Sequence, residues 1–248
     1  MFKKRIIKHF LALFILVSIM TFGLFLFEKT FNNDVLISYG VSEKNISVTT
    51  EVEQTEKPNE VIELRNAYNN NDIQGKLVIE GTDISEPILK ANDNSYYLNH
   101  NAYGAYQAEG SVYQDYRTKL GGKKILIFGH SSPGWSVPFN ELEKYYDKSF
   151  YDNHKYIKII GENEIYNYEI FSVYVETKDY TYMNLNIDEE TYNSYLRKYQ
   201  DRSFYDTKVK VNDNDNILIL QTCSNKAEYA NYKKKYLLVI AKEIRDVK

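Results

Sequence analysis

Near its N-terminus the chain carries an uncharged segment of 18 residues, Phe10–Phe27. A helix of that length spans about 27 Å, just enough to cross the hydrocarbon core of a membrane. Four cations precede it: Lys3, Lys4, Arg5 and Lys8. The positive-inside rule therefore places Met1 in the cytoplasm and everything after Glu28 outside. A cleaved signal peptide is the alternative, although its apolar core is normally shorter and no small-x-small cleavage site precedes Glu28.

This segment divides the chain into three parts. We expect residues 1–28 to form a cytoplasmic tip and a transmembrane anchor, residues 29–60 a polar tether, and residues 61–248 an extracytoplasmic domain. The stretch SVTTEVEQTEKPNE in the tether has too few apolar residues to fold by itself. The third part is long enough for one sizeable core. The net charge of −3 does not indicate the basic face that nucleic-acid binding requires.

Short strands dominate the pattern of residues 61–248, with two helices among them. A short helix is expected within Val61–Asp72, a stretch that ends in a turn cluster. A longer helix is expected over Asn186–Gln200, with Asp188 or Asn186 as its N-cap. Four side chains of the longer helix form one stripe for core packing: Tyr192, Tyr195, Leu196 and Tyr199. Strands are expected within 75–91 (two), 110–117, 123–130, 155–177 (a hairpin), 216–222 and 236–242. This pattern indicates a mainly β fold, a closed or nearly closed barrel.

The chain has a single cysteine, Cys223, at the end of an apolar run. Outside the cytoplasm small domains commonly form disulfides, which one cysteine cannot do within the chain. An odd cysteine there indicates either pairing between molecules or a reactive thiol. An inert buried cysteine is the alternative, but oxidation threatens an idle thiol in that compartment. To act as a nucleophile the thiol needs a base or a cation beside it.

Of the four histidines, His130 is the best placed for chemistry. It ends the apolar strand KKILIFGH and opens an irregular loop, a position from which a side chain can serve a site. His9 lies at the expected membrane edge. His100 and His154 lie in polar, turn-like surroundings, where we expect them to be solvated.

The residues around His130 and Cys223 resemble the sortases, membrane-anchored cysteine transpeptidases of Gram-positive bacteria. A strand and His in ILIFGHSS are followed, 93 positions later, by a strand, Thr and Cys in ILILQTCS. The family signature is Thr-Leu-x-Thr-Cys, and Ile219–Cys223 matches it apart from Ile for the first Thr. Class B members resemble this chain most, in DNSYYLNHN from Asp93, GSVYQDYR from Gly110 and FNELEKYYDKSFY from Phe139. The resemblance covers residues 61–244.

The resemblance implies a sortase barrel of about eight strands, with N-terminal helices and a long helix between the sixth and seventh strands. It implies that Cys223 attacks the carbonyl of a Thr in the sorting signal of a surface protein, giving an acyl-thioester that an amine of the peptidoglycan cross-bridge resolves. His130 would protonate the leaving amine and deprotonate the incoming one. It also implies contacts to the sorting signal from four residues: Leu98, Tyr182, Gln221 and Thr222. No cofactor or metal is expected.

The chain departs from the family at one position of the active site. Sortases carry an Arg at the start of the strand after the cysteine, which donates hydrogen bonds to the substrate and the oxyanion, but no Arg occurs here between Cys223 and Arg245. Tyr236 falls where the Arg belongs, and Lys235 lies one place before it. Either Lys235 supplies the cation through a one-residue bulge, or Tyr236 donates through its hydroxyl. Otherwise the site is weakened or the cation comes from elsewhere, with Arg117 and Arg202 as candidates.

Two lesser departures concern neighbours of the catalytic pair. Gln221 stands where the family usually has a small residue, which would narrow the peptide groove, and Ser131 replaces an Asn that often follows the His.

Two other functions stay open. One is a degenerate sortase that binds peptides with little turnover, which the missing Arg favours. The other is an unrelated cysteine hydrolase, although several such families place Cys before His in the chain.

Overall fold

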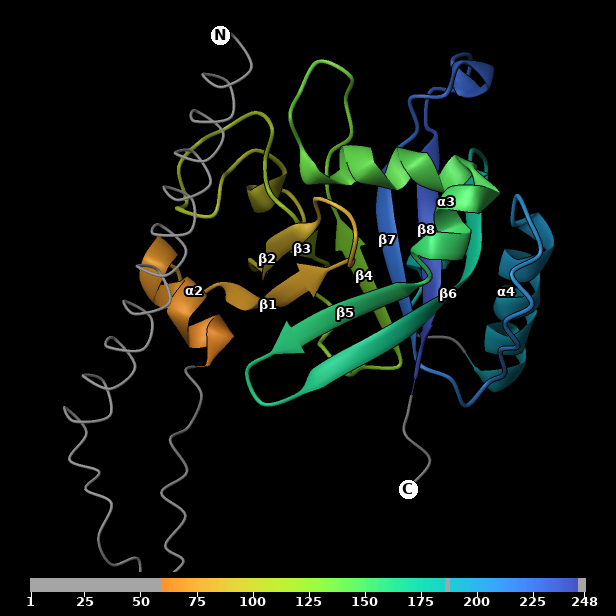
Figure 1. Cartoon of the computed structure of the whole chain (residues 1–248), viewed down its shortest axis with the longest axis horizontal. Coiled ribbons are helices and arrows are strands. Elements are labelled where there is room, and N and C mark those ends of the chain that lie inside the picture. Colours follow the sequence, from red (N-terminus) through yellow and green to blue (C-terminus); the bar gives the residue numbers. More distant parts are fainter. Residues whose placement is uncertain (1–58, 186–187, 245–248) are drawn as a thin grey trace, which may run out of the picture. The chain divides into compact units, whose positions relative to one another are not determined.

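The computed structural model describes residues 59–185 and 188–244, so the expected anchor and nearly all of the expected tether lie outside the described residues. Within these two ranges no helix is both long and apolar enough to span a membrane. Here eight strands form a closed barrel in the order β1-β2-β3-β4-β7-β8-β6-β5, with β5 returning to β1 (Figure 1). The strands are β1 Ile73–Val78, β2 Ser85–Leu89, β3 Tyr113–Gln114, β4 Lys124–Phe128, β5 Tyr156–Gly161, β6 Ile165–Glu176, β7 Ile217–Cys223 and β8 Tyr236–Glu243.

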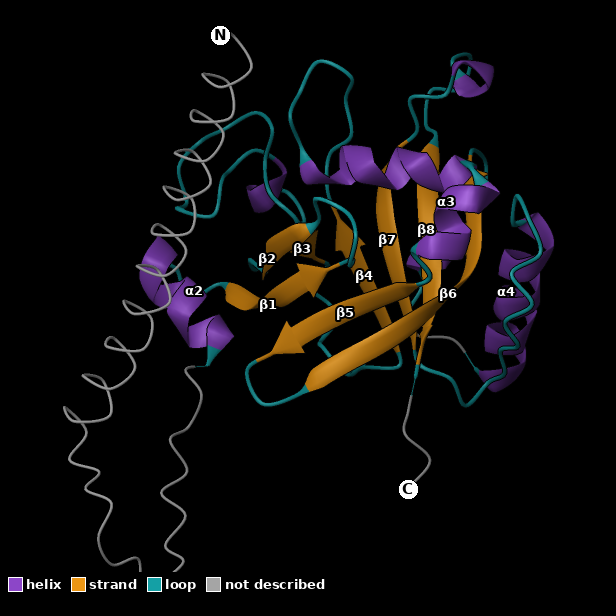
Figure 2. Ribbon diagram, in the orientation of Figure 1, coloured by secondary structure: helices purple, strands orange, loops and turns teal. Residues whose placement is uncertain are grey.

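Helices lie around the barrel and at its ends (Figure 2). Those described are α2 Glu60–Tyr68, η1 Tyr96–Leu98, η2 Pro138–Tyr146, α3 Lys148–Asn153, η3 Thr181–Met183, α4 Glu189–Arg202 and η4 Ala227–Tyr229, where η marks a 3-10 helix. The long helix α4 connects β6 to β7 and packs beside β6 (Figure 1). This position confirms the helix expected between the sixth and seventh strands.

The central strands are buried on both faces, which is why their sequences read as continuous apolar runs. In β4, Ile125 and Ile127 pack into the barrel interior, whereas Leu126 and Phe128 pack into a second core outside it. That outer core is covered by α4 through the stripe expected from the sequence, of which Tyr192, Leu196 and Tyr199 are buried and Tyr195 is half-buried. Strand β7 divides in the same way. Two cores therefore pack on opposite faces of one sheet, one inside the barrel and one outside it.

The longer helix begins as its sequence indicates. The Asp188 side chain accepts a hydrogen bond from the Thr191 backbone N–H at 2.8 Å, which satisfies one of the free amide groups of the first turn. Glu189 and Glu190 follow in the first turn, where carboxylates are favoured by the helix dipole. The last turn ends at Arg202, two residues beyond the expected end.

The short helix expected within 61–72 ends at Tyr68, because Asn69 adopts a left-handed conformation with φ 49° and caps it. One expected element is shorter in the structure. The strand expected over 110–117 pairs only at Tyr113 and Gln114. After it, the Asp115 carboxylate accepts the Arg117 backbone N–H at 2.9 Å, so the chain turns away from the sheet.

Candidate active site

Two neighbouring parallel strands bring His130 and Cys223 together. Strands β4 and β7 pair in register from Lys124 with Ile217 to Phe128 with Gln221. Continued by two residues, this register places His130 beside Cys223. Because residues two apart on a strand face the same side, both side chains emerge on the side of the outer core. The structure thus joins a pair that is 93 positions apart in the sequence.

Hydrogen bonds fix the two strand ends beyond the last paired residues. The Gly129 N–H donates to the Gln221 carbonyl at 3.2 Å, and the Thr222 hydroxyl donates to the Gly129 carbonyl at 2.8 Å. Gly129 also lies against the ring of buried Phe139, where a Cβ atom would be only 2.7 Å from Cδ2. A larger residue would displace the strand end that carries His130.

The imidazole of His130 is held by a backbone carbonyl. Its Nε2 lies 2.9 Å from the Leu98 oxygen, and its ring meets the edge of Trp135 with centroids 5.6 Å apart. A carbonyl only accepts hydrogen bonds, so Nε2 carries the hydrogen in this geometry. Nδ1 is therefore the nitrogen with a lone pair when the ring is neutral.

The loops that follow His130 and Cys223 are tied to one another. Asn225 donates through Nδ2 to the Ser131 hydroxyl at 2.7 Å, and Ser131 donates to the Asn140 side-chain oxygen at 3.0 Å. Asn140 accepts a second bond from the Ser132 N–H at 2.8 Å. The serine that departs from the family pattern is thus part of a bridge between the two loops. Asn140 and Asn225 were not predicted from the sequence, since bonds between side chains so far apart in the chain leave no local pattern.

Opposing influences act on the Cys223 thiol, which is exposed at the end of β7. Partial desolvation of the thiol raises its pKa, and the positive charge of Lys235 lowers it. The Glu143 carboxylate raises the thiol pKa further. Glu143 accepts the Asn225 backbone N–H at 3.0 Å, and burial raises the pKa of its carboxyl as well. Glu143 was not anticipated from the sequence.

Tyr236 lies directly across from Cys223. The antiparallel pairing of β7 with β8 runs from Ile217 with Lys242 to Cys223 with Tyr236 and contains no register shift. The one-residue bulge considered for Lys235 is therefore absent, and Tyr236 is the cross-strand partner of Cys223. Lys235 is half-buried just before the strand, while Lys233 and Lys234 are exposed.

The two arginines considered as alternative cations are engaged elsewhere. Arg117 forms an ion pair with the buried Asp115 at 2.7 Å, and Arg202 pairs with the buried Glu176. The structure thus gives each arginine a buried carboxylate as its ion-pair partner. Both serve to satisfy those carboxylates.

Two of the four residues expected to contact a sorting signal reach the surface, and two are buried. Leu98 is 43% exposed beside His130, and Gln221 is half-buried two residues before Cys223. Tyr182 is 1% exposed and donates to the Gln221 side-chain oxygen at 2.7 Å, so it orients the amide of Gln221. Thr222 is also 1% exposed, and its hydroxyl donates its hydrogen bond to the Gly129 carbonyl. Contact of any of the four with a peptide stays a prediction.

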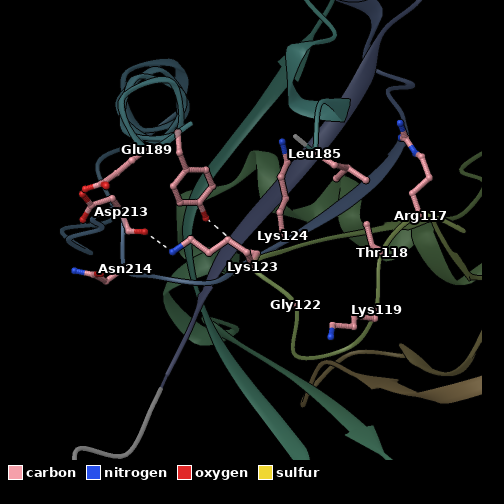
Figure 3. A pocket seen from close by; sticks show the side chains of 11 residues that line it. Arg117, Thr118, Lys119, Gly122, Lys123, Lys124, Leu185, Glu189, Asp213 and Asn214 are labelled. Carbon is pink, nitrogen blue, oxygen red and sulfur yellow. Dashed lines mark hydrogen bonds between the residues drawn. The ribbon is translucent and has the colours of Figure 1, made fainter. Parts of the chain in front are cut away.

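A cavity of about 500 Å³ lies away from the thiol, at the beginning of β4 (Figure 3). Lys124 points into it and donates to the Asn184 carbonyl at 2.9 Å. Burial, aided by the charge of Arg117, lowers the pKa of the Lys124 ammonium to about 7. Since β4 begins at Lys124 and His130 follows its other end, this cavity is separate from the site of Cys223.

Comparisons with known proteins agree with this geometry. The model of the Sortase domain family matches residues 77–244. Sortase B of Listeria monocytogenes is 34% identical over 210 residues, which cover 84% of this chain and 84% of the relative. The structure of the Staphylococcus aureus sortase B-substrate complex superposes with a TM-score of 0.66 at 27% identity, covering 75% of this chain and 85% of that one.

A further sortase B, solved in complex with triglycine, has a TM-score of 0.66 and 28% identity and covers 75% of this chain and 86% of that one. The closed eight-stranded barrel thus matches sortase B structures, as the sequence resemblance implied. The chain belongs to the sortase family and is a sortase B-like cysteine transpeptidase.

Proposed function

We propose that this sortase is anchored in the membrane by residues 1–28 and attaches surface proteins to the cell wall. Cys223 is the nucleophile and His130 the general acid and base. The single observation that carries the assignment is the register of β4 with β7, which aligns the ends of two adjacent strands so that His130 and Cys223 share one face.

The first half-reaction forms an acyl-thioester. The Cys223 thiolate adds to the carbonyl carbon of the scissile peptide bond, and the carbonyl electron pair moves to oxygen. When the intermediate collapses, the C–N bond breaks and the amine leaves with a proton from the His130 imidazolium. With Nε2 held by the Leu98 carbonyl, Nδ1 is the nitrogen that transfers this proton.

The second half-reaction passes the acyl group to an amine. A neutral His130 takes a proton from the incoming amine as its nitrogen attacks the thioester carbonyl, and the Cys223 thiolate leaves. The acceptor we propose is an amine of peptidoglycan. A sortase B solved in complex with triglycine supports an amine-bearing peptide as acceptor, and the S. aureus sortase B-substrate complex supports a peptide donor.

The proposed location follows from the order of charge and hydropathy in the sequence. Cations before the apolar segment Phe10–Phe27 favour a cytoplasmic N-terminus, with residues 29–60 as a tether and residues 61–248 outside the membrane. An extracytoplasmic domain would meet both proposed substrates on the same side of the membrane.

Cleavage of a panel of fluorogenic sorting-signal peptides tests the proposal. The full-length chain in mild detergent should cleave at least one peptide, form an acyl adduct on Cys223 detectable by mass spectrometry, and turn over faster when triglycine is added. Cys223→Ala should abolish cleavage, and His130→Ala should slow it by about 10²–10⁴. His154→Ala is the matched control, because His154 stacks on Phe150 instead of lying at the site.

Two outcomes would contradict the proposal in different ways. Cleavage that triglycine does not accelerate would indicate a hydrolase. Binding of a peptide without any adduct on Cys223 would indicate a peptide-binding module with little turnover.

A further inference from the structure

Tyr236 is the side chain nearest to Cys223 across the β7–β8 ladder. The two residues are a cross-strand pair, so their side chains project on the same face. On the far side of Tyr236, strand β6 places Glu176 opposite it. The order His130, Cys223, Tyr236, Glu176 therefore runs across four adjacent strands at one end of the sheet.

The hydroxyl of Tyr236 is available as a donor. Among the described residues no acceptor takes a hydrogen bond from it, although the ring is half-buried and packs edge-on to Tyr180 with centroids 5.9 Å apart. Glu176 cannot serve as that acceptor. One of its oxygens takes three backbone N–H groups, those of Thr177, Lys178 and Asp179, and the other pairs with Arg202. Burial and the neighbouring thiol raise the pKa of Tyr236, so its proton is present at neutral pH.

Lys235 is less well placed for the same task. Lys235 lies just before β8 and is not the cross-strand partner of Cys223, since the Lys235 carbonyl accepts the N–H of the residue after Cys223, Ser224, at 2.9 Å. Ser224 is buried and bonded to Tyr146. The charge of Lys235 lowers the pKa of both Glu143 and Cys223. Its effect is on the ionisation of the thiol.

We infer that the Tyr236 hydroxyl donates a hydrogen bond to the substrate carbonyl oxygen as it becomes an oxyanion. The inference rests on the proposed role of Cys223 as nucleophile. When the thiolate of Cys223 adds to the carbonyl carbon, negative charge develops on the carbonyl oxygen. That oxygen is one bond away from the carbon attached to Sγ, on the face of the sheet that Tyr236 shares with Cys223. The phenol keeps its proton throughout, and the bond to oxygen strengthens as the charge grows. A neutral donor thus takes the position that the family gives to a cation.

The test compares two reactions of the same thiol in the full-length chain. Acylation by 4-nitrophenyl acetate passes through a tetrahedral oxyanion and releases one equivalent of 4-nitrophenolate, whereas alkylation by iodoacetamide is a direct displacement without an oxyanion. Tyr236→Phe should slow acylation by about 10²-fold and leave alkylation within about two-fold of the wild type. Tyr232→Phe, an exposed tyrosine of the same loop, is the matched control and should change neither rate.

Cys223→Ala gives the background rate of both reactions, because Cys223 is the single cysteine of the chain. Equal losses in acylation and alkylation would overturn the inference, since they would assign Tyr236 to thiolate formation or to folding. An unchanged acylation rate in Tyr236→Phe would overturn it as well. Neither reagent contains a sorting signal, so a failure to cleave sorting peptides would count against the proposed function and leave this comparison interpretable.

Discussion

At the scale of single residues, the active site shows how one position along a strand separates two roles. Lys235 and Tyr236 are neighbours in the chain, yet only Tyr236 is paired with Cys223 across the β7–β8 ladder. Lys235 affects the thiol through its charge, in competition with Glu143. The reactivity of the thiol and the stabilisation of the oxyanion therefore depend on different side chains, and substitutions can separate them.

We predict that the ionisation of Cys223 responds in opposite directions to its two charged neighbours. Lys235→Met should raise the thiol pKa and Glu143→Gln should lower it, because the first removes a favourable charge and the second an unfavourable one. The pH dependence of iodoacetamide alkylation measures both shifts. Lys233→Met is the matched control, since Lys233 is exposed in the same loop. Identical profiles for all three variants would show that neither charge reaches the thiol.

At the scale of secondary-structure elements, the end of β6 is held by one carboxylate. Glu176 is 2% exposed, and its Oε1 accepts the N–H groups of Thr177, Lys178 and Asp179 at 2.8–2.9 Å. Its Oε2 pairs with Arg202 at the end of α4. Glu176 therefore joins the turn after β6 to the C-terminal end of the long helix, beside Tyr236.

We predict that Glu176→Ala lowers the free energy of unfolding by about 3–5 kcal/mol, because it leaves three amides without an acceptor and Arg202 without its partner. Glu176→Gln keeps a side-chain oxygen for the amides and should cost only about 1 kcal/mol. Urea unfolding of both variants measures the difference. Similar losses in the two would show that the charge, and not the cap on the turn, holds the element.

At the scale of the whole molecule, the two cores are built to an unusual extent from tyrosine. The chain has 24 tyrosines, and among the residues that the structure describes nine are buried in the two cores. Burial raises the pKa of Tyr113 and of Tyr151 to about 12. It raises the pKa of several others still further, including Tyr182 and Tyr199. Burial in the two cores thus disfavours the phenolate form of these tyrosines.

We predict that the protein unfolds cooperatively in alkali. Above about pH 10 the unfolded chain loses phenolic protons that the folded chain keeps, so the free energy of unfolding falls as pH rises. Each tyrosine of this kind contributes a slope of about 1.4 kcal/mol per pH unit between its unfolded and folded pKa. The ultraviolet absorbance of phenolate and far-UV circular dichroism should therefore change together. Ionisation of the buried tyrosines without loss of the dichroism signal would contradict the prediction.

Much of the fold was predictable because its signals are local. Helix α4 has a capping Asp188 and a stripe at helical spacing, and the strand at 123–130 is an apolar run between turn residues. The strand expected over 110–117 was wrong beyond Gln114, since the side chain of Asp115 competes with the sheet for the backbone. Strand propensity alone does not predict which side chain will bind the backbone and end the pairing with the sheet.

What the sequence by itself determined is the chemistry available: one thiol, a histidine at a strand end, and a Tyr where the family has an Arg. The tertiary structure alone decided how these groups are used. The parallel register of β4 with β7 aligned His130 with Cys223, and the unbroken register of β7 with β8 chose Tyr236 over Lys235 as the residue facing the thiol. The Leu98 carbonyl fixed the tautomer of His130 from a distant loop. Register and long-range backbone contacts depend on how both cores pack around the sheet, and no local pattern of residues encodes that packing.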